Sequence, residues 1–297
     1  MSSEQPRVSV VTPSYNQGSF LEETMLSVLN QKYPNLEYMV MDGGSADASV
    51  EIIKKYATRL SYWQTRKDRG PADAINQGWK RASGKILCYL NSDDVLVENA
   101  IQIVVDAFQN HPDADVIYGD TTFVDEKGVF IKNAPSEIFD LKNIFTTWKD
   151  PIYQPSAFLR KELIDRNGYL DESFQFCFDF EYWIRIAETT RFLRLPLNLS
   201  FARSHVSCKS VAQQDVQARE LMRIYRIVRD KPSFTNSGVS KIEAEKALYF
   251  RAAEHFLHAG HKREAFSAHI SFCRRAFPPH ESIYRILRYA GRIFFRN

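Results

Sequence analysis

The first 120 residues alternate between two spacings of apolar side chains. Residues 7–12 form a short β-branched run typical of a strand, and residues 20–30 carry apolar side chains at helical spacing. The same order returns in a strand expected at 37–41 and a helix at 48–57, with a further short strand at 61–64. Strands that alternate with helices predict an α/β fold with a doubly wound, mostly parallel, Rossmann-like sheet.

Polar residues follow the strands of this pattern. A helix predicted at 72–82 leads into an apolar strand at 86–90, and residues 91–94, Asn-Ser-Asp-Asp, come directly after it. Ligands of open α/β sheets bind at the carboxyl ends of the strands, where loops and helix N-termini offer unpaired donors. We therefore expect residues 12–16 and 42–45 to meet residues 91–94 at one edge of the sheet.

The second half of the chain changes character. A strand at 116–118, a hairpin around residues 126–128 and a helix at 178–188 are expected before residue 210. Beyond residue 210 the apolar spacing is helical in four segments, 211–229, 241–259, 261–276 and 281–295. The pattern therefore predicts an α/β domain over residues 1–210 and a helical C-terminal extension over residues 211–297.

The composition narrows the class of protein. At 297 residues with 44% apolar residues, the chain is long enough for a nucleotide-binding domain and a smaller attached unit. Its polar N-terminus and the lack of an apolar run of about 20 residues indicate a cytosolic, unprocessed protein without a membrane-spanning helix. The four cysteines lie far apart and form no C-x-x-C pair, so neither a zinc site nor a disulfide framework is expected.

The net charge of +3 conceals a basic C-terminal segment. From His261 onward eight Lys or Arg face two Glu, a net charge of +6, which leaves −3 for the rest of the chain. No zinc, RRM or helix-turn-helix pattern accompanies these residues, so we expect no nucleic-acid partner. The last apolar residues recur at helical spacing with arginines on other faces, which describes a basic amphipathic helix. Its apolar residues are Ile283, Ile286, Leu287, Ala290, Ile293 and Phe294, and its arginines are Arg285, Arg288, Arg292 and Arg296.

Two explanations suit this helix. It can lie on an anionic cytoplasmic membrane surface, where each Lys or Arg contributes about 1 kcal/mol. Its apolar stripe can instead pack against the rest of the chain or against a second subunit, with the arginines solvated. The sequence leaves both explanations open, and the oligomeric state with them.

The Asp-Asp pair after the strand at 86–90 has the chemistry of a cation site. Mg²⁺ is usually held by one or two carboxylates together with substrate phosphates and water. Asp93 is our first choice as a ligand for Mg²⁺ or Mn²⁺. The pair alone is ambiguous, because Asn, Ser and Asp also begin turns and Asp94 can cap the helix that follows.

A set of motifs in a fixed order favours the cation site. The motifs are VVTPSYN at 10–16, DGGSAD at 42–47, DRG at 68–70, AINQG at 74–78, LNSDD at 90–94, GYLDE at 168–172, DFEYWIR at 179–185 and RSH at 203–205. In order and spacing this set resembles the inverting family 2 glycosyltransferases of the GT-A fold, of the type that builds bacterial cell-surface polysaccharides. The resemblance covers roughly residues 7–210. It implies a catalytic domain over 1–210, with a nucleotide-binding half at about 1–120 and an acceptor half at about 121–210.

The resemblance implies a site for a nucleotide-diphosphate sugar in the first half. Thr12 and Tyr15 would line the nucleoside pocket, and Asp42 would accept a hydrogen bond from the base. An imide N–H opposite a carboxylate suits uracil or thymine, so a UDP-sugar is the first expectation and a dTDP-sugar the second. The other residues expected at the donor site are Pro13, Asn16, Asp68, Asp73, Asn76, Asn91, Ser92 and Asp93.

The resemblance also implies a metal site. Asp93 would coordinate the metal that bridges the phosphates, and His205 would approach the metal or the diphosphate from a C-terminal loop, where a neutral imidazole can serve. A lone His on a loop is otherwise an ordinary surface residue. The family pattern often has Asp where this chain has Asn91, a neutral and weaker magnesium ligand, which indicates a lowered metal affinity.

Inversion implies a general base on the acceptor side, which removes the proton of the acceptor hydroxyl in a single displacement. Asp179 matches the family's base position, where nearby aromatic residues can raise its pKa, and Glu181 is the second candidate. The helix macrodipole alone also explains an Asp at this helix start. Gln154 matches a loop that faces the acceptor, or a plain turn, and Trp183 can stack on a sugar ring or simply fill the core.

These expectations define the predicted function. The chain would transfer a sugar from a nucleotide-diphosphate sugar to a saccharide or lipid-linked saccharide, in polysaccharide, glycan or lipid-linked saccharide biosynthesis. It would act in the cytoplasm, with a peripheral membrane contact if the terminal helix binds there.

Two other functions compete with this one. A sugar nucleotidyltransferase would need a Gly-rich phosphate loop with Lys or Arg near the N-terminus, where Gly18 stands alone. A non-catalytic nucleotide-sugar-binding module is favoured by Asn91, whereas Asp93, Asp179 and His205 together oppose it.

Overall fold

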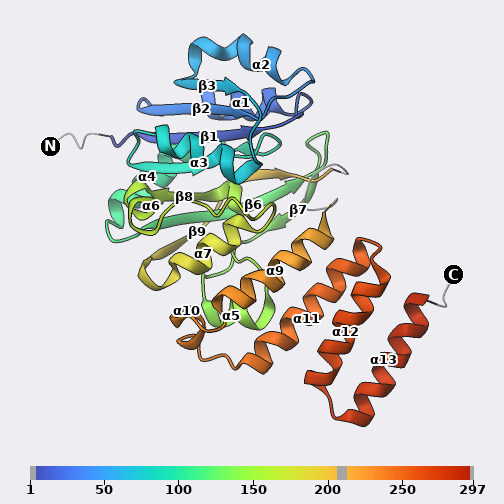
Figure 1. Ribbon diagram of the computed structural model, residues 1–297. Helices are drawn as coiled ribbons and strands as arrows, with labels where there is room; N and C mark the ends of the chain where they lie inside the picture. The colour runs from blue at the N-terminus through green and yellow to red at the C-terminus, as the bar shows by residue number, and fades with distance from the viewer. Residues whose placement is uncertain (1–4, 206–212, 295–297) are drawn as a thin grey trace. The chain divides into compact units, whose positions relative to one another are not determined.

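The computed structural model of the protein describes residues 5–205 and 213–294, which form two compact units (Figure 1). The first unit holds residues 5–138, 151–178 and 189–205 of the described chain. The second holds residues 139–150, 179–188 and 213–294. The functional boundary expected near residue 210 stays a prediction.

The first unit is built on one sheet with the strand order β3-β2-β1-β4-β8-β6-β9-β5, and β7 pairs with β6. Four neighbouring strands are parallel, namely β1 (Val8–Ser14), β2 (Leu36–Asp42), β3 (Tyr62–Thr65) and β4 (Ile86–Tyr89). The later strands are β5 (Val95–Leu96), β6 (Val116–Val124), β7 (Phe130–Ala134), β8 (Ala157–Arg160) and β9 (Phe192–Arg203). Strand β8 is antiparallel to β4 and β6, whereas β6 and β9 are parallel. The predicted α/β fold is confirmed, with a mixed sheet whose first half is parallel.

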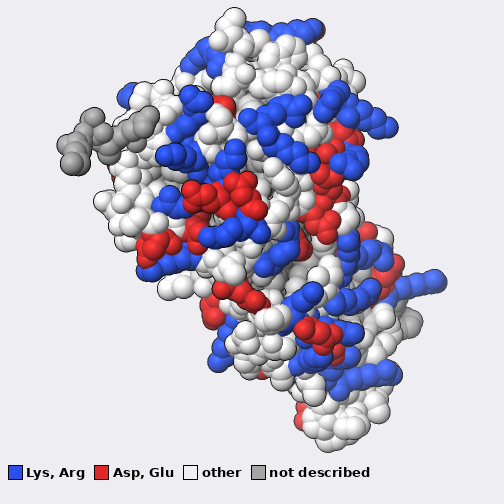
Figure 2. Space-filling model, turned by 60° about the vertical axis from the view of Figure 1, so that its left-hand side comes forward, with Lys and Arg blue, Asp and Glu red and all other residues white. Residues whose placement is uncertain are grey.

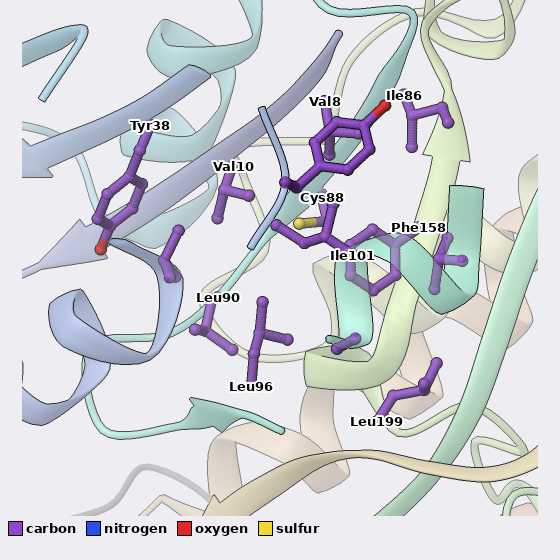
Figure 3. Packing of buried hydrophobic residues seen from close by; sticks show 14 of the residues in the cluster. Val8, Val10, Tyr38, Ile86, Cys88, Leu90, Leu96, Ile101, Phe158 and Leu199 are labelled. Carbon is purple, nitrogen blue, oxygen red and sulfur yellow. The ribbon is translucent and has the colours of Figure 1, made fainter. Parts of the chain in front are cut away.

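Helices cover both faces of the parallel half (Figure 1). They are α1 (Leu21–Leu29), α2 (Ser49–Tyr56), α3 (Pro71–Arg81) and α4 (Ala100–Asn110), and the short α6 (Lys161–Asn167) follows β8. Because successive strand residues point to opposite faces, Val8 and Val10 join a buried cluster with Cys88 of β4 and Ile101 of α4 (Figure 3). Val11 points the other way, toward α3.

Strand β1 runs two residues beyond the predicted end at Thr12. We expected the strand to stop before Pro13, which has no N–H for a sheet ladder. In the structure β4 pairs with β1 only as far as Val11, while β2 continues beside it to Ser14. Pro13 therefore lies in the part of β1 that no longer pairs with β4.

Strand β6 extends six residues beyond the predicted end at residue 118. The sequence of residues 119–122, Gly-Asp-Thr-Thr, is too polar to suggest a buried strand. In the fold, the hydroxyl groups of Thr121, Ser156 and Ser200 hydrogen-bond to one another at 2.7–2.9 Å, and all three residues are buried. Since their polar groups are satisfied inside the protein, a polar stretch can serve as a central strand. The predicted hairpin around residues 126–128 is confirmed between β6 and β7.

The second unit is helical. Its elements are α5 (Leu141–Thr147), most of α7 (Phe178–Ile186), α9 (Gln214–Val228), α10 (Pro232–Thr235), α11 (Lys241–His258), α12 (Lys262–Ala276) and α13 (Pro279–Phe294). The four long helices predicted beyond residue 210 are confirmed where described, and residues 206–212 and 295–297 lie outside the described residues. Small residues such as Ala218, Ala252 and Ala265 fill the contact between α9, α11 and α12.

Trp148 explains why α5 and α7 cluster with these helices. It is 2% exposed, and its indole Nε1 donates a hydrogen bond to the carbonyl of Ala244 in α11 at 2.9 Å. Its ring also contacts Phe145, Phe180 and Tyr225. No helix among the described residues is both long and apolar enough to cross a membrane.

We predict that Gly78→Ala destabilises the first unit. In a helix this change normally gains about 1 kcal/mol, but a Cβ at Gly78 would lie 2.5 Å from Cγ1 of Val11, a stiff β-branched residue. The free energy of unfolding in urea should fall by about 1–3 kcal/mol. The control is Gly291→Ala, a helical site with no atom within 4 Å of the added Cβ, which should lose no stability. Equal unfolding of Gly78→Ala and wild type would contradict this packing of α3 on β1.

Candidate active site

The residues predicted for a donor site lie at or beyond the carboxyl ends of the parallel strands. Thr12 and Pro13 lie within the last three residues of β1, and Asp42 ends β2. The loops and the helix after β1, β3 and β4 carry Tyr15, Asn16, Asp68, Asp73, Asn76, Asn91, Ser92 and Asp93. The four strands are parallel and adjacent, so these ends share one edge of the sheet. The expected convergence of residues 12–16, 42–45 and 91–94 at that edge follows from this topology.

The Asp42 carboxylate organises the loop after β2. Its Oδ2 accepts hydrogen bonds from the backbone N–H of Gly44 at 3.1 Å, from that of Ser45 at 2.9 Å and from Thr65 Oγ1 at 2.6 Å. Its Oδ1 accepts one from Ser45 Oγ at 2.5 Å, and the residue is 1% exposed. A base that bonds Asp42 would share oxygens that already accept hydrogen bonds, and its role toward the base stays a prediction.

The loop after β1 is tied to the loop after β2. Asn16 has a left-handed backbone with φ of 52°, its N–H donates to Ser45 Oγ at 2.8 Å, and its Oδ1 accepts from the N–H of Ala46 at 2.9 Å. Thr12 is buried and its hydroxyl bonds that of Tyr38 at 2.9 Å. Tyr15, by contrast, is 62% exposed. Tyr15 therefore has a side chain available to a nucleoside, whereas the side chain of Asn16 already bonds the neighbouring loop.

The residues after β3 mainly bind one another. Asp73 accepts hydrogen bonds from the backbone and side chain of Arg69, and these hold its pKa below the usual range although burial opposes the shift. Asp68 Oδ1 accepts from the N–H of Gly70 at 2.9 Å. Asn76 is 1% exposed and fastens Leu170 to α3 through two hydrogen bonds. These contacts shape the loops around the site, and direct contact with a donor stays a prediction.

Asp93 and His205 come together from opposite halves of the chain. Nε2 of His205 lies 3.1 Å from Oδ2 of Asp93, and the His205 ring contacts that of Phe20 at 4.6 Å between centroids. No group of three His, Cys, Asp or Glu suited to a metal occurs among the described residues, so the protein offers two candidate ligands at this point. The carboxylate oxygen suits Mg²⁺ or Mn²⁺ and the imidazole suits Mn²⁺ better than Mg²⁺, so the pair fits such an ion if phosphates and water complete it.

Arg203 is the residue of this site to which the sequence assigned no role. Its guanidinium donates to the carbonyl of Asp93 at 3.2 Å, to the carbonyls of residues 125 and 126 at 3.3 and 3.1 Å, and to Glu23 Oε2 at 2.5 Å. Its backbone N–H donates to Asp94 Oδ1 at 3.2 Å. The one sequence signal was its place in the RSH motif, two residues before His205.

Asp94 and Gln154 support the same loop. Burial, with the neighbouring Asp93 charge, raises the pKa of Asp94 well above its ordinary value. Asn91 Nδ2 donates to Asp94 Oδ2 at 3.2 Å and to Gln154 Oε1 at 3.4 Å. Gln154 is 7% exposed and its Nε2 donates to the carbonyl of Tyr89 at 2.7 Å. The Asn91 amide therefore donates its hydrogen bonds within the protein, to Asp94 and to Gln154, the residue expected to face the acceptor.

Helix α7 in the second unit carries the predicted base candidates. Burial raises the pKa of Asp179 to about 6, the N–H of Phe180 partly opposes this by donating to Oδ1 at 2.8 Å, and the Glu220 charge adds to the rise. Glu181 is instead paired with Arg185 through two contacts of 2.9 and 3.1 Å. Trp183, expected as an acceptor platform, is 2% exposed. Asp179 thus has the more suitable carboxyl, while the roles of all three stay predictions.

The surface charges of the protein are interleaved on the face seen in Figure 2, where Lys and Arg lie among Asp and Glu. This face therefore carries no field of a single sign over a large area.

The sequence is similar to one protein family and to several bacterial proteins. Residues 9–168 match Glycosyl transferase family 2. An uncharacterized glycosyltransferase of Haemophilus influenzae is 34% identical over 131 residues, which cover 43% of this chain and 52% of that protein. One of Rickettsia bellii is 33% identical over 143 residues, 47% of this chain and 20% of that protein. The chain thus spans about half of the first and a fifth of the second.

Two solved structures share the fold. The S. aureus TarS 1–349 structure in complex with UDP-GlcNAc has a TM-score of 0.64 at 19% identity and covers 97% of this chain and 88% of its own. The mannosyltransferase PcManGT from Pyrobaculum calidifontis, in complex with GDP-Man and Mn²⁺, has a TM-score of 0.61 at 18% identity and covers 99% of this chain and 82% of its own.

We predict that Asp179 makes stability depend on pH. Its pKa of about 6 in the fold exceeds the ordinary 3.8, so between these values the folded protein keeps a proton that the unfolded chain has released. The contribution is full below about pH 4 and is lost as the pH rises through about 6. Urea unfolding from pH 4 to 7 should show Asp179→Asn gaining stability relative to wild type. The exposed Asp165→Asn should follow the wild type, and parallel curves for all three would contradict the raised pKa.

Proposed function

The chain belongs to glycosyl transferase family 2 and has the GT-A fold, and from that premise we propose the reaction that it catalyses. It transfers a sugar from a nucleotide-diphosphate sugar to a hydroxyl acceptor, with inversion at the anomeric carbon. The observation that carries this proposal is the pair of Asp93 and His205, whose Oδ2 and Nε2 lie 3.1 Å apart in the segments that follow β4 and β9. A carboxylate and an imidazole at the carboxyl edge of the sheet suit a metal-bound diphosphate.

The proposed donor is a UDP-sugar, with a dTDP-sugar second. Exposed Tyr15 and the loop held by Asp42 border the edge where a nucleoside would lie, and a carboxylate opposite an imide N–H favours uracil or thymine over adenine. The related fold of TarS occurs with UDP-GlcNAc and that of PcManGT with GDP-Man. The fold therefore accommodates more than one nucleotide, and the donor has to be measured.

Asp93 and His205 are the proposed ligands of Mg²⁺ or Mn²⁺. When bound, the ion would neutralise the charge that develops on the departing diphosphate. Asn91 stands where an additional carboxylate is often found, and its amide donates to Asp94 and Gln154. Asp94, the second acid of this loop, accepts hydrogen bonds from Asn91 and from the Arg203 N–H, so Asp93 is the carboxylate that we assign to the ion. Arg203 holds the loop backbone in place through the Asp93 carbonyl.

Asp179 is the proposed general base. With a pKa of about 6 its carboxylate is largely ionised at neutral pH and still basic enough to take a proton. In the single displacement the acceptor oxygen bonds to the anomeric carbon, the bond from that carbon to the diphosphate oxygen breaks, and the hydroxyl proton passes to Asp179. Glu181 is the weaker candidate, because Arg185 already binds both of its oxygens.

The proposed acceptor is a saccharide or lipid-linked saccharide, in the synthesis of a polysaccharide, glycan or lipid-linked saccharide. Gln154, fixed beside Asn91, would offer hydrogen bonds to its hydroxyl groups. Trp183 would take part only through its edge or after a rearrangement, since it is 2% exposed. We place the reaction in the cytoplasm, in whose reducing conditions the buried thiols of Cys88, Cys177 and Cys273 would persist.

Release of the free nucleotide from a panel of UDP-, dTDP- and GDP-sugars, with Mn²⁺, Mg²⁺ or chelator, tests this proposal. We expect release that requires the metal and that falls at least about 100-fold in Asp179→Asn, the usual scale for losing a general base. Asp165→Asn, an exposed carboxylate in α6, is the matched control and should keep wild-type activity.

Three outcomes separate the candidates. Loss of activity in Asp179→Asn alone supports the transferase with Asp179 as base. Equal activity of Asp179→Asn and wild type would remove Asp179 from the mechanism. Binding of a nucleotide sugar without release in any condition would favour a non-catalytic binding module instead, which the neutral Asn91 at the metal loop suits.

A further inference from the structure

Helix α13 packs on α12 through one of its faces. Ser282 is 4% exposed, and its hydroxyl donates hydrogen bonds to the carbonyls of Cys273 and Phe277 at 2.8 and 3.0 Å. The ring of Tyr289 stacks on that of His269 in α12 at 3.8 Å between centroids, and Ile293 is 5% exposed. Successive helix residues are turned by about 100°, so positions 282, 289 and 293 lie on one side. Helix α13 is therefore held against α12 by this one side.

A second face of α13 is apolar and uncovered. Ile283 is 61% exposed, Tyr284 65% and Leu287 66%. By the same rotation of about 100° per residue, positions 283 and 287 lie beside each other along the helix, about a third of a turn from the packed side, with 284 next to 287. In Figure 1, α13 is the last of the row of helices α11, α12 and α13. The apolar stripe recognised in the sequence is therefore divided, with one part against α12 and the other exposed.

A third face is basic and borders the exposed apolar face. Arg285, Arg288 and Arg292 are exposed, at about 240–300° from Ser282 by the same rotation of about 100° per residue, so Arg288 lies about 40° beyond Tyr284. Arg285 lies over the Phe277 ring at 3.9 Å, with Glu281 3.9 Å from its guanidinium. Arg288 and Arg292 form no ion pair with any residue in 5–205 or 213–294. Their positive charge is not neutralised by the described part of the protein.

We propose that α13 docks the protein on an anionic lipid surface. Ile283 and Leu287 enter the boundary between headgroups and acyl chains, Tyr284 lies at the level of the headgroups, and Arg288 and Arg292 bind lipid phosphates. A helix with a packed face, an apolar face and a basic face meets the two needs of interfacial binding, burial of apolar area and attraction to anionic headgroups. The inference goes beyond the proposed reaction, since it requires no donor, metal or acceptor.

Charge complementarity favours a lipid surface over a second copy of the chain. Two copies that meet through the whole exposed apolar face, including Tyr284, would bring the adjacent Arg288 side chains close to each other, and like charges across a contact oppose association. An anionic membrane supplies the opposite charge to the same residues. A lipid-linked acceptor would then be brought to the protein in two dimensions.

Flotation of the full chain with phosphatidylcholine vesicles, with and without phosphatidylglycerol, tests the inference. We expect binding only to the vesicles that contain phosphatidylglycerol, and weaker binding as salt screens the arginines. Ile283→Ser with Leu287→Ser should lower binding at least about tenfold, because it removes the buried apolar area. Arg288→Glu with Arg292→Glu should lower it by a similar factor.

Matched controls come from neighbouring helices. Ile242→Ser removes an equally exposed apolar side chain, 63% exposed, from α11, and Lys262→Glu with Arg263→Glu reverses two exposed charges on α12. Both should bind as the wild type does, and circular dichroism checks the fold of every variant. Absence of wild-type binding, or equal binding of the α13 variants and controls, would overturn the inference. So would a change in sedimentation mass of Ile283→Ser with Leu287→Ser that shows a lost dimer without lost vesicle binding.

Discussion

The candidate metal site depends on one buried cation, the guanidinium of Arg203. A buried guanidinium is costly unless it is paired and hydrogen-bonded. Here Glu23 of α1 binds it, three backbone carbonyls accept from it, and the Phe20 ring lies 5.1 Å from it. The contacts join α1, the loop after β4, the turn between β6 and β7, and the end of β9. Because His205 follows two residues later, the same contacts determine where the imidazole meets Asp93.

The loops at the sheet edge are held by hydrogen bonds within the protein itself. Asp42, Asp73 and Asn76 belong to the motifs expected to bind a donor, yet their polar atoms already bind neighbouring loops and helices. Such contacts keep loops in one arrangement, and a preorganised polar site stabilises developing charge better than one that must rearrange. Several motif residues thus act first as supports, while Tyr15, Asp93 and His205 are the residues that we propose to meet a ligand.

The sequence predicted what depends on local periodicity. The strands and helices of the parallel half and the long helices after residue 210 follow from apolar spacing, since one face of each element has to be buried. Strand β6 was predicted too short because its Thr121 is satisfied by Ser156 and Ser200, which lie 35 and 79 residues away. No local pattern reveals such partners.

The residues of the candidate site also fall into two groups, those that the sequence predicts and those that only the fold reveals. The carboxylates Asp93 and Asp179 were found through motifs, and the pairing of Glu181 with Arg185 has the i, i+4 spacing of a helical ion pair. The role of Arg203 in joining several loops was not predictable, because its partners Glu23 and Asp93 are 180 and 110 residues away in the sequence. The raised pKa of Asp179 comes from burial, which only the fold defines.

The central claim is that Asp93 and His205 present a metal-bound diphosphate at the sheet edge, and nucleotide binding tests it most directly. Calorimetric titration with UDP, in Mn²⁺ and in chelator, requires neither the right sugar nor an acceptor. The account predicts that UDP binds with Mn²⁺, and that chelator or Asp93→Asn each weakens binding at least about tenfold. UDP binding of equal strength in wild type, in Asp93→Asn and in chelator would contradict it.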